Sequence, residues 1–323
     1  MPKGLGFQRK HRKLGYRIKY MYYYVARREL LQKKVSYGNK NIDITVYIIK
    51  PDFQDGVEGL LSLIYKQLLY INHAYKKKYI PYVDWKNYKT QYYDGEHNAW
   101  NDFFEQPEKI SEQEVYKSKN VILSGWTFFD INKNGVFEAS VFKNEKLKQE
   151  SSQIFRKYLR FNKEVLQKVE EEATKLNIEE CMGVYLRGTD YVKLKPSGEY
   201  VQPSAEQMIE QVKVFLKKYD APIFLVTEDG SIADKIKETF PDRVRTVSFD
   251  SYVRGYEGKD VLSKSNVLDS DKKRRGQDYL VKMILLSRCK YLITSITQGS
   301  KFSYLLNDGK YEDEYVFDLG LYP

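Results

Sequence analysis

The sequence predicts an α/β protein built from two halves that face each other across a cleft. Three observations indicate this class. Short apolar runs of strand length alternate with amphipathic helical patterns along most of the chain. The 323 residues suffice for two domains of ordinary size. A content of 42% hydrophobic and 30% charged residues is typical of a soluble globular protein. Alternating strands and helices form parallel sheets that helices cover on both faces.

The alternation is less regular in the first half of the chain. Strands are predicted at 44–49, 80–85 and 120–124. Between the first two lies a helix whose apolar residues recur at helical spacing, namely Val57, Leu60, Leu61, Ile64, Leu68, Ile71 and Tyr75. Residues 86–118 mix aromatic and polar side chains, which indicates loops and short helices.

The second half shows a regular order of elements. Residues 151–176 carry one long helical pattern that is charged on one side. Strands are then predicted at 181–186, 223–226, 244–249, 291–295 and 315–319. Helices separate them, with starts at Pro203-Ser204, Gly230-Ser231, Gln277 and near Ser300. Ser204 and Gln207 have the spacing of a capping box.

Positive charge is concentrated at the beginning of the chain. Residues 1–34 contain eleven Lys and Arg against one Glu, so they carry the whole formal charge of +10. Such a basic, tyrosine-rich segment suits an anionic membrane surface. Nucleic acid is the rival partner, and the neutral remainder of the chain makes it unlikely. A solvated tail, or a helix packed on its own domain, is the third alternative.

The remaining bulk features favour a cytoplasmic location. Cys181 and Cys289 border predicted strands and are expected to be buried structural thiols. The sequence has no glycosylation sequon, no apolar run approaching the ~18 residues that span a bilayer, and no apolar stretch like that of a signal peptide. We therefore expect a reducing compartment, and a peripheral position at the inner face of the membrane if residues 1–34 bind lipid.

The stretch from Val184 to Tyr191 carries the clearest chemical signal. An apolar strand ends in Arg187, which is followed by Gly188, Thr189 and Asp190. Ligands of open α/β sheets bind at such strand ends. The planar guanidinium suits phosphate, and a glycine allows close approach of the backbone. The alternative is a simple Arg-Asp ion pair at the end of a strand.

Two further loops should lie along the same edge of the sheet. Residues 227–230 supply carboxylates, and residues 295–300 supply hydroxyls, an amide and backbone N–H groups just before a helix. Together with Arg187, this set fits a nucleoside diphosphate. A carboxylate would accept the paired donors of guanine and would disfavour adenine.

These loops resemble the three motifs of the glycosyltransferases that use GDP-fucose, which include the α1,6-fucosyltransferases and the protein O-fucosyltransferases. Tyr185 to Tyr191 is similar to the His-Val-Arg-Arg-Thr-Asp motif of that group, and Phe224 to Asp229 is similar to its Thr-Asp-Asp motif. Asp278 to Ser300 is similar to the third motif. Less specific similarity continues through the first half, at 56–59, 80–84 and 98–107, so that about three-quarters of the chain is covered in order.

The resemblance implies two Rossmann-like domains in a GT-B-like arrangement. The expected organisation is a basic segment at 1–34, an acceptor-side α/β domain at 35–150 and a domain that binds the nucleotide sugar at 151–323. The resemblance also implies inversion at the sugar carbon without a metal. The family's histidine and second arginine are replaced here by Tyr185 and Gly188, which bears on the donor's base and sugar more than on its diphosphate.

Roles of individual residues follow from the same resemblance. Arg187 would bind the donor phosphates, Asp229 would meet guanine, and Thr297 and Gln298 would supply a phosphate-side hydroxyl and amide. The other residues expected around the donor are Gly56, Gly188, Thr227, Gly299 and Ser300.

The acceptor hydroxyl needs a base, and the α1,6-fucosyltransferases carry a candidate where Glu199 stands. A solvated loop acid is the alternative for Glu199. Asp190 would orient Arg187 or act as the base, and the orienting role is favoured.

Possible metal sites are weak. Residues 130–135 imitate the start of a calcium loop, but Val141 stands where glutamate is required. Asp269-Ser270-Asp271 resembles the metal-binding motif of other glycosyltransferases but lacks supporting ligands. His11, His73 and His97 do not have the spacing of a zinc site. We predict no metal and no bound cofactor.

The function predicted from the sequence is transfer of fucose from GDP-fucose, or of a related sugar, to a hydroxyl of a glycan or lipid-linked glycan, as in polysaccharide biosynthesis. The alternatives are an inactive scaffold of the same fold that binds GDP-sugars or glycans, motivated by Tyr185 and Gly188, and a transferase that uses another nucleotide sugar.

Overall fold

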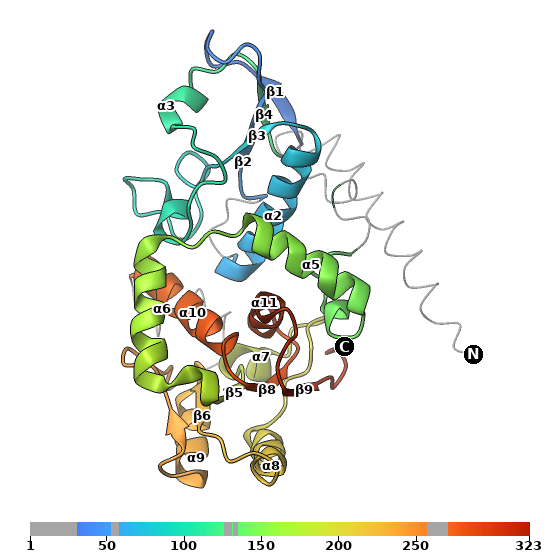
Figure 1. Ribbon diagram of the computed structural model, residues 1–323, viewed down its shortest axis with the longest axis vertical. Helices are drawn as coiled ribbons and strands as arrows, with labels where there is room; N and C mark the ends of the chain where they lie inside the picture. Colours follow the sequence, from blue (N-terminus) through green and yellow to red (C-terminus); the bar gives the residue numbers. More distant parts are fainter. Residues whose placement is uncertain (1–30, 53–57, 126–130, 132–134, 257–270) are drawn as a thin grey trace, which may run out of the picture.

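Two sheets, each with its own helices, make up the described part of the protein (Figure 1). The computed structural model describes residues 31–52, 58–125, 131, 135–256 and 271–323. The predicted α/β class is confirmed. Most of the basic segment 1–34 lies outside the described residues, as do the predicted donor residue Gly56, residues 130 and 132–134 of the calcium-like loop, and residues 269–270.

The N-terminal sheet has four strands in the order β1-β4-β2-β3. Its strands are β1 (Lys33–Val35), β2 (Val46–Ile49), β3 (Ile80–Val83) and β4 (Val121–Leu123). β2 pairs in parallel with β3 and β4, whereas β1 runs antiparallel to β4 at the edge. All residues of β2 are buried, as expected for a strand covered on both faces. β1 was not predicted, because the polar Lys33 and Lys34 hide its strand character.

The C-terminal sheet has five strands in the order β7-β6-β5-β8-β9, and all of them are parallel. Its strands are β5 (Met182–Tyr185), β6 (Ile223–Val226), β7 (Val244–Arg245), β8 (Tyr291–Ser295) and β9 (Asp313–Phe317). Counted within this sheet the order is 3-2-1-4-5, the doubly wound arrangement. The order reverses between β5 and β8, and ligands of such sheets bind beyond the strand ends at that point.

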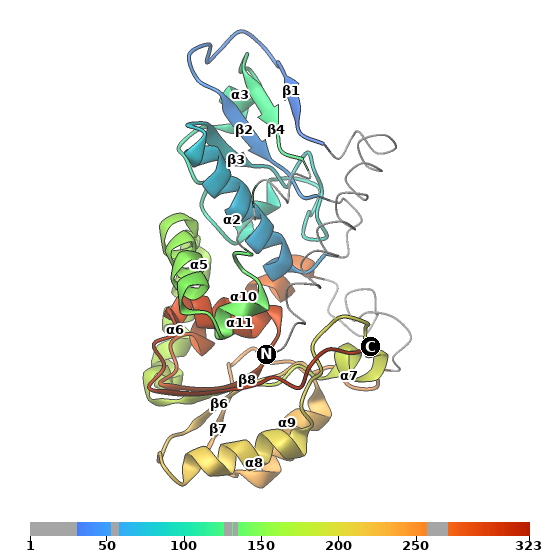
Figure 2. The ribbon, with the colours of Figure 1, turned by 90° about the vertical axis from the view of Figure 1, so that its right-hand side faces the viewer.

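Helices between the two sheets join them through one apolar core (Figure 2). These helices are α2 (Leu60–Lys76), α5 (Glu145–Tyr158), α10 (Lys272–Leu286) and α11 (Gln298–Asn307). Phe155 of α5 lies 5.7 Å from the ring of Tyr65 of α2 and 5.3 Å from that of Phe302 of α11, measured between centroids. The two units therefore share buried surface.

The opposite face of the C-terminal sheet is covered by α8 (Ala205–Leu216) and α9 (Gly230–Thr239), which lie below the sheet in Figure 2. Met208 and Ile236 pack there against Ile223 in a second core. The predicted capping box of Ser204 and Gln207 is confirmed at the start of α8. The remaining helices are α3 (Glu112–Val115), α6 (Lys163–Leu176), α7 (Thr189–Leu194), η2 (Ala99–Asp102), η3 (Ala139–Phe142) and η4 (Ile178–Glu180).

The prediction of one helix over 151–176 is wrong, because two helices occupy this region and are separated at 159–162. In the break, the Asn162 side chain accepts a hydrogen bond from the Val165 N–H and caps α6. Its own N–H donates to the Phe103 carbonyl, and Phe161 forms a bridge with Phe104. Backbone pairing with another segment thus replaces the helical hydrogen bonds.

Other predicted elements differ at their ends, for example β9, which covers Asp313–Phe317 instead of 315–319. β7 covers two residues instead of 244–249, because the Ser248 N–H donates to the buried Glu172 carboxylate and not to β6. α10 begins five residues before Gln277, where Asp271 accepts a hydrogen bond from the Arg274 N–H. α11 begins at Gln298 rather than near Ser300.

Two simpler expectations are also resolved. Cys181 and Cys289 are free and buried, as predicted. Across the described ranges, the helices are all too short or too polar to cross a bilayer.

Candidate functional site

Arg187 lies just beyond β5, beside the point where the strand order reverses. Its neighbour Leu186 still donates to the Val226 carbonyl, so the sheet fixes the backbone immediately before the arginine. The side chain keeps 22% of its surface exposed. Nη2 lies 3.3 Å from Asp190 Oδ1, and the guanidinium carbon lies 4.5 Å from the centre of the Tyr191 ring. Nε is buried and has no hydrogen-bond partner.

The charge of Arg187 is well supported. Burial acts to lower its pKa, but neighbouring acidic and phenolic groups, with Glu228 first among them, raise that pKa well above the ordinary value. The guanidinium therefore stays positive and offers an unused N–H group. A buried donor without a partner is unusual in folded proteins and suits a site that a ligand completes.

Asp190 has the contacts that an orienting role requires. Its side chain is 7% exposed, and Oδ1 accepts hydrogen bonds from the Tyr191 N–H at 3.0 Å and from Arg187. The carboxylate thereby ties the guanidinium to the first turn of α7. The orienting role itself stays a prediction.

Asp229 is committed to hydrogen bonds within the chain. Oδ1 accepts from the Ser231 N–H and hydroxyl at 3.0 and 2.6 Å, and so caps α9. Oδ2 accepts from the Thr189 N–H at 3.1 Å, which holds Thr189 at a left-handed φ of 51°. This conformation is strained for a β-branched residue. A guanine edge would have to share these oxygens, and the predicted contact with the base remains untested.

Gly188 is required by packing. A Cβ atom placed there would lie 2.7 Å from the Asp229 Cβ. No side chain fits unless the loop moves, so a second arginine of the kind found in the family motif is excluded at this position by the present packing. Thr227, a predicted donor residue, is 2% exposed and accepts a hydrogen bond from the Asp229 N–H.

The first turn of α11 offers free backbone donors. Thr297 and Ser300 form a reciprocal capping box, which satisfies the Ser300 N–H. The N–H groups of Gln298 and Gly299 have no acceptor among the described residues. Backbone donors at a helix start attract anions. The Gln298 carbonyl accepts from the Tyr65 hydroxyl of α2 at 2.9 Å, which ties this turn to the N-terminal unit.

Two tyrosines stand beside this turn. The hydroxyls of Tyr185 and Tyr279 lie 3.4 Å apart, and a Cβ atom on Gly299 would come within 2.8 Å of both. Burial raises the pKa of each phenol, so both are neutral hydrogen-bonding groups near pH 7. Neither phenol was predicted as a site residue, although Tyr185 was recognised as a departure from the family motif.

Glu228 is the charged residue that the sequence reasoning passed over. It occupies the same place beyond β6 that Arg187 occupies beyond β5, because Tyr185 and Val226 are paired. The Glu228 carbonyl accepts from the Val253 N–H at 2.7 Å. Oε2 is buried without a hydrogen-bond partner. Only the fold distinguishes this acid from its neighbour Asp229.

The last two predicted site residues are Glu199, which lies on the surface, and Gly56, which is outside the described residues. Glu199 is exposed, with its backbone held by the Tyr322 N–H. Burial raises the pKa of Tyr191, Arg187 lowers it, and the charge of Glu199 raises it by a smaller amount. Glu199 therefore belongs to the surroundings of Arg187. Gly56 cannot be placed. The start of α2 that follows it has no side-chain cap, and its Leu60 N–H donates to the Tyr92 hydroxyl at 3.0 Å.

Lys301 is a second buried cation that sequence reasoning missed. The side chain donates to the Phe137 carbonyl, and Nζ lies 4.4 Å from the centre of the Tyr65 ring. Burial lowers its pKa to about 8. Lys301 is therefore mostly protonated at neutral pH and places a positive charge where α11 meets α2.

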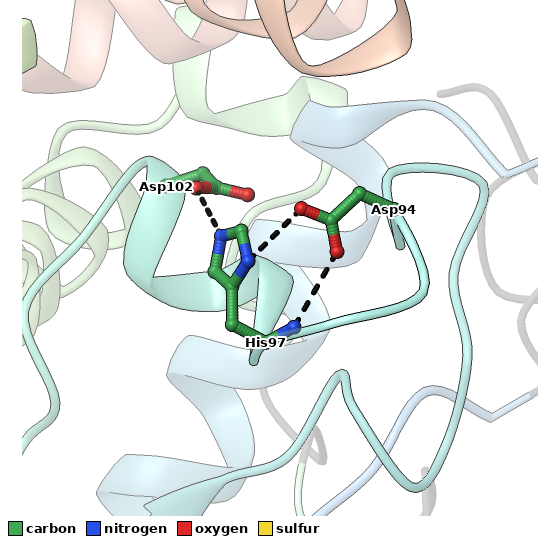
Figure 3. Close-up of side chains that lie close together, drawn as sticks. All are labelled: Asp94, His97 and Asp102. Carbon is green, nitrogen blue, oxygen red and sulfur yellow. Dashed lines mark hydrogen bonds and ion pairs between the residues drawn. The ribbon is translucent and has the colours of Figure 1, made fainter.

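His97 lies between two carboxylates near the start of α10 (Figure 3). Nδ1 is 2.9 Å from Asp94 and Nε2 is 2.8 Å from Asp102, which also pairs with Lys273 at 3.0 Å. The hydrogen bond to Asp102 raises the pKa of His97. Both ring nitrogens are engaged as donors of a charged imidazole, so the trio fits a metal less well than a network of ion pairs.

The described residues also form a hollow away from Arg187. It has a volume of about 190 Å³ and lies on the N-terminal sheet rather than at Arg187, lined by Lys34, Val35, Thr45, Tyr79, Lys119, Asn120, Val121 and Ile122.

Comparison with known proteins gives a likeness of fold. No family model matches the chain, and no curated protein is similar to it in sequence. The fucosyltransferase NodZ from Bradyrhizobium is similar over 81% of this chain and 93% of its own, with 15% identity and a TM-score of 0.47. POFUT1 in complex with GDP is similar over 85% and 73%, with 11% identity and a TM-score of 0.38. A variant of Arabidopsis thaliana FUT1 in complex with GDP is similar over 84% and 70%, with 12% identity and a TM-score of 0.43.

Proposed function

We propose that this protein is a glycosyltransferase that moves fucose from GDP-fucose to a hydroxyl of a glycan, with inversion at the sugar carbon and without a metal. The observation that carries the proposal is the Arg187 guanidinium. It stands at the reversal point of a doubly wound sheet, keeps its charge and has a buried Nε–H without a partner. The planar guanidinium fork matches the oxygens of a diphosphate, which supports this donor.

The chemistry asks for stabilisation of the leaving diphosphate. As the sugar–phosphate bond breaks, negative charge grows on the departing oxygen. Arg187 and the free N–H groups of Gln298 and Gly299 are preorganised donors for that charge. Asp190 would keep the guanidinium in place through their 3.3 Å contact. The neutral phenols of Tyr185 and Tyr279 would donate hydrogen bonds without adding negative charge.

The proposal also includes the base of the donor nucleotide and the acceptor. GDP and GDP-fucose are the ligands named for the similar structures, so they are the first to test. Asp229 would contact guanine only by sharing its oxygens with α9 and Thr189. A glycan or lipid-linked glycan is the proposed acceptor, with residues 1–34 at an anionic membrane surface on the cytoplasmic side.

The decisive experiment compares nucleotides. Thermal unfolding of the full chain is followed with GDP, UDP, ADP and CDP, with EDTA present or absent, and is repeated on Arg187→Ala. We expect GDP to stabilise the wild type selectively, independently of EDTA, and the variant to lose that stabilisation. Equal effects of all four nucleotides, or none, would remove the donor assignment.

A binding protein without catalysis is the second candidate. The specific observation in its favour is Gly188, where packing against Asp229 leaves no room for a second arginine. GDP-fucose that binds but releases no GDP, in the presence of varied glycans, would select this candidate.

A further inference from the structure

We propose that Glu228 is the general base that takes the proton from the acceptor hydroxyl, in place of the exposed Glu199. This inference rests on the proposed function. Its starting point is a pair of opposite groups with unused hydrogen-bonding capacity. Arg187 Nε and Glu228 Oε2 are both buried and both lack partners.

The sheet holds the two residues side by side. Tyr185 of β5 and Val226 of β6 are partners in register, and each functional residue follows its partner by two positions. The backbone of Glu228 is fixed by the Val253 N–H. The two side chains do not form an ion pair with each other, yet Glu228 is the neighbour whose charge acts most strongly on Arg187 in the direction that raises its pKa. The carboxylate and the guanidinium are therefore close enough to interact electrostatically but do not form an ion pair.

A ligand that satisfies both buried atoms must accept a hydrogen bond from Arg187 and donate one to Glu228. Phosphate oxygens satisfy Arg187. A carboxylate oxygen needs a donor, and the donor adjacent to the sugar–phosphate bond during transfer is the acceptor hydroxyl. A base must lie within hydrogen-bond reach of the proton that it removes, and the proposal requires the acceptor hydroxyl to approach Glu228 Oε2.

The other carboxylates near Arg187 are already engaged. Asp190 contacts the guanidinium and the Tyr191 N–H, and Asp229 caps α9 and holds Thr189. Glu199 is exposed on its loop. Glu228 is the acid of this group that has a buried carboxylate oxygen without a hydrogen-bond partner among the described residues.

The acceptor oxygen forms a bond to the sugar carbon while its proton passes to Glu228 Oε2. The bond between that carbon and the diphosphate oxygen breaks, and its electron pair leaves with GDP, whose new charge Arg187 stabilises. The proton on Glu228 then returns to water.

The test compares the same substitution at two acids. Glu228→Gln and Glu199→Gln are each assayed for GDP binding by calorimetry and for GDP released from GDP-fucose, with water as the acceptor, between pH 5 and 9. We expect Glu228→Gln to bind GDP as the wild type does and to lose about 10²–10⁴-fold in turnover across this pH range. Glu199→Gln should keep both GDP binding and turnover.

A second variant guards against a folding defect. Glu228→Ala should regain turnover when formate is added, because a small carboxylate can enter the vacated space, whereas a misfolded protein would not respond. Normal turnover in Glu228→Gln, or a loss confined to Glu199→Gln, overturns the inference. Loss of GDP binding in Glu228→Gln would show instead a contact to the donor, and also overturns it. A wild type that binds no GDP contradicts the proposed function itself.

Discussion

The two sheets differ in how they prepare a site. The C-terminal sheet is fully parallel, and its strand ends bring Arg187, Glu228 and the start of α11 to one edge. The N-terminal sheet is shorter and mixed, and it reaches the same region through the start of α2 and the Tyr65 and Tyr92 hydroxyls. Strand ends fix charged groups by backbone pairing, whereas the N-terminal unit supplies neutral contacts from a helix and loops. Substitutions at the strand ends of the C-terminal sheet should therefore mainly affect the rate of transfer. Substitutions in the N-terminal unit should mainly affect how the two units pack together.

The largest effect that this comparison predicts is at Arg187. Arg187→Ala should reduce turnover by about 10²–10³-fold, because one preorganised donor to the leaving group is lost. Arg187→Lys should recover only part of it, since an ammonium group cannot reproduce the planar fork. Initial rates of GDP release measure the effect, and near-normal rates in Arg187→Ala would remove the strand-end site from the mechanism.

Two glycines test the contrast in packing. Gly299→Ala should destabilise the protein by about 1–3 kcal/mol, because its Cβ would lie 2.6 Å from the Tyr279 hydroxyl. Gly59→Ala, at the start of α2, meets no described atom within 4 Å and should cost only a few tenths of a kcal/mol. Chemical unfolding of both variants measures the difference. Equal losses would mean that the two helix starts are packed alike.

Asp229 separates a structural role from a recognition role. Asp229→Ala should cost about 1 kcal/mol through loss of the α9 cap. Burial acts to raise the pKa of Asp229, but hydrogen bonds from Ser231, Thr189 and Ile232 lower it overall. Its stabilisation is therefore present above about pH 3.9, the unfolded value, and is lost as pH falls through the lowered folded value.

Unfolding measured from pH 2 to 7 should show that acid-dependent term in the wild type and not in Asp229→Ala. The ratio of GDP to ADP affinity should remain unchanged in the variant. A collapse of that ratio would instead support contact of Asp229 with guanine.

The smallest effect concerns the contact between the units at His97. The hydrogen bond to Asp102 raises the pKa of His97, so its stabilisation is fully present below about pH 6.5, the unfolded value, and fades as pH rises through the raised folded value. His97 is 47% exposed, so His97→Gln should cost no more than about 1 kcal/mol at pH 5.5. Urea unfolding at pH 5.5 and 8.5 should show a difference from wild type only at the lower pH. A difference that grows with pH would contradict the charged-imidazole arrangement.

Sequence patterns predicted β5, β6 and β8 well because these strands are apolar runs buried on both faces, with polar residues after their ends. The less buried edge strands β7 and β9 were predicted with other bounds. The same patterns missed β1, whose Lys33 and Lys34 carry no strand signal. They also missed the break between α5 and α6. That break depends on Asn162 pairing with Phe103, which is distant in sequence.

The candidate site shows the same division. The strand-end position of Arg187 follows from an apolar run that ends in a charge, so the sequence was sufficient to predict that position. Adjacent acids are a harder case. A sequence pattern does not distinguish Glu228 from Asp229, because both are acids that follow the same strand. Only the three-dimensional contacts reveal that Asp229 caps α9 and that Glu228 has an oxygen without a hydrogen-bond partner. The grouping of Asp94, His97 and Asp102 likewise depends on the path of a loop that has no periodic signal.

The apolar cluster that runs from Tyr65 through Phe155 to Phe302 has a practical consequence for dissection of the chain. Cutting the protein between its two sheets would turn these rings outward into water on both fragments. Neither fragment is then a self-sufficient folding unit, and separate expression of the halves should yield aggregates that recover order only when the two are produced together.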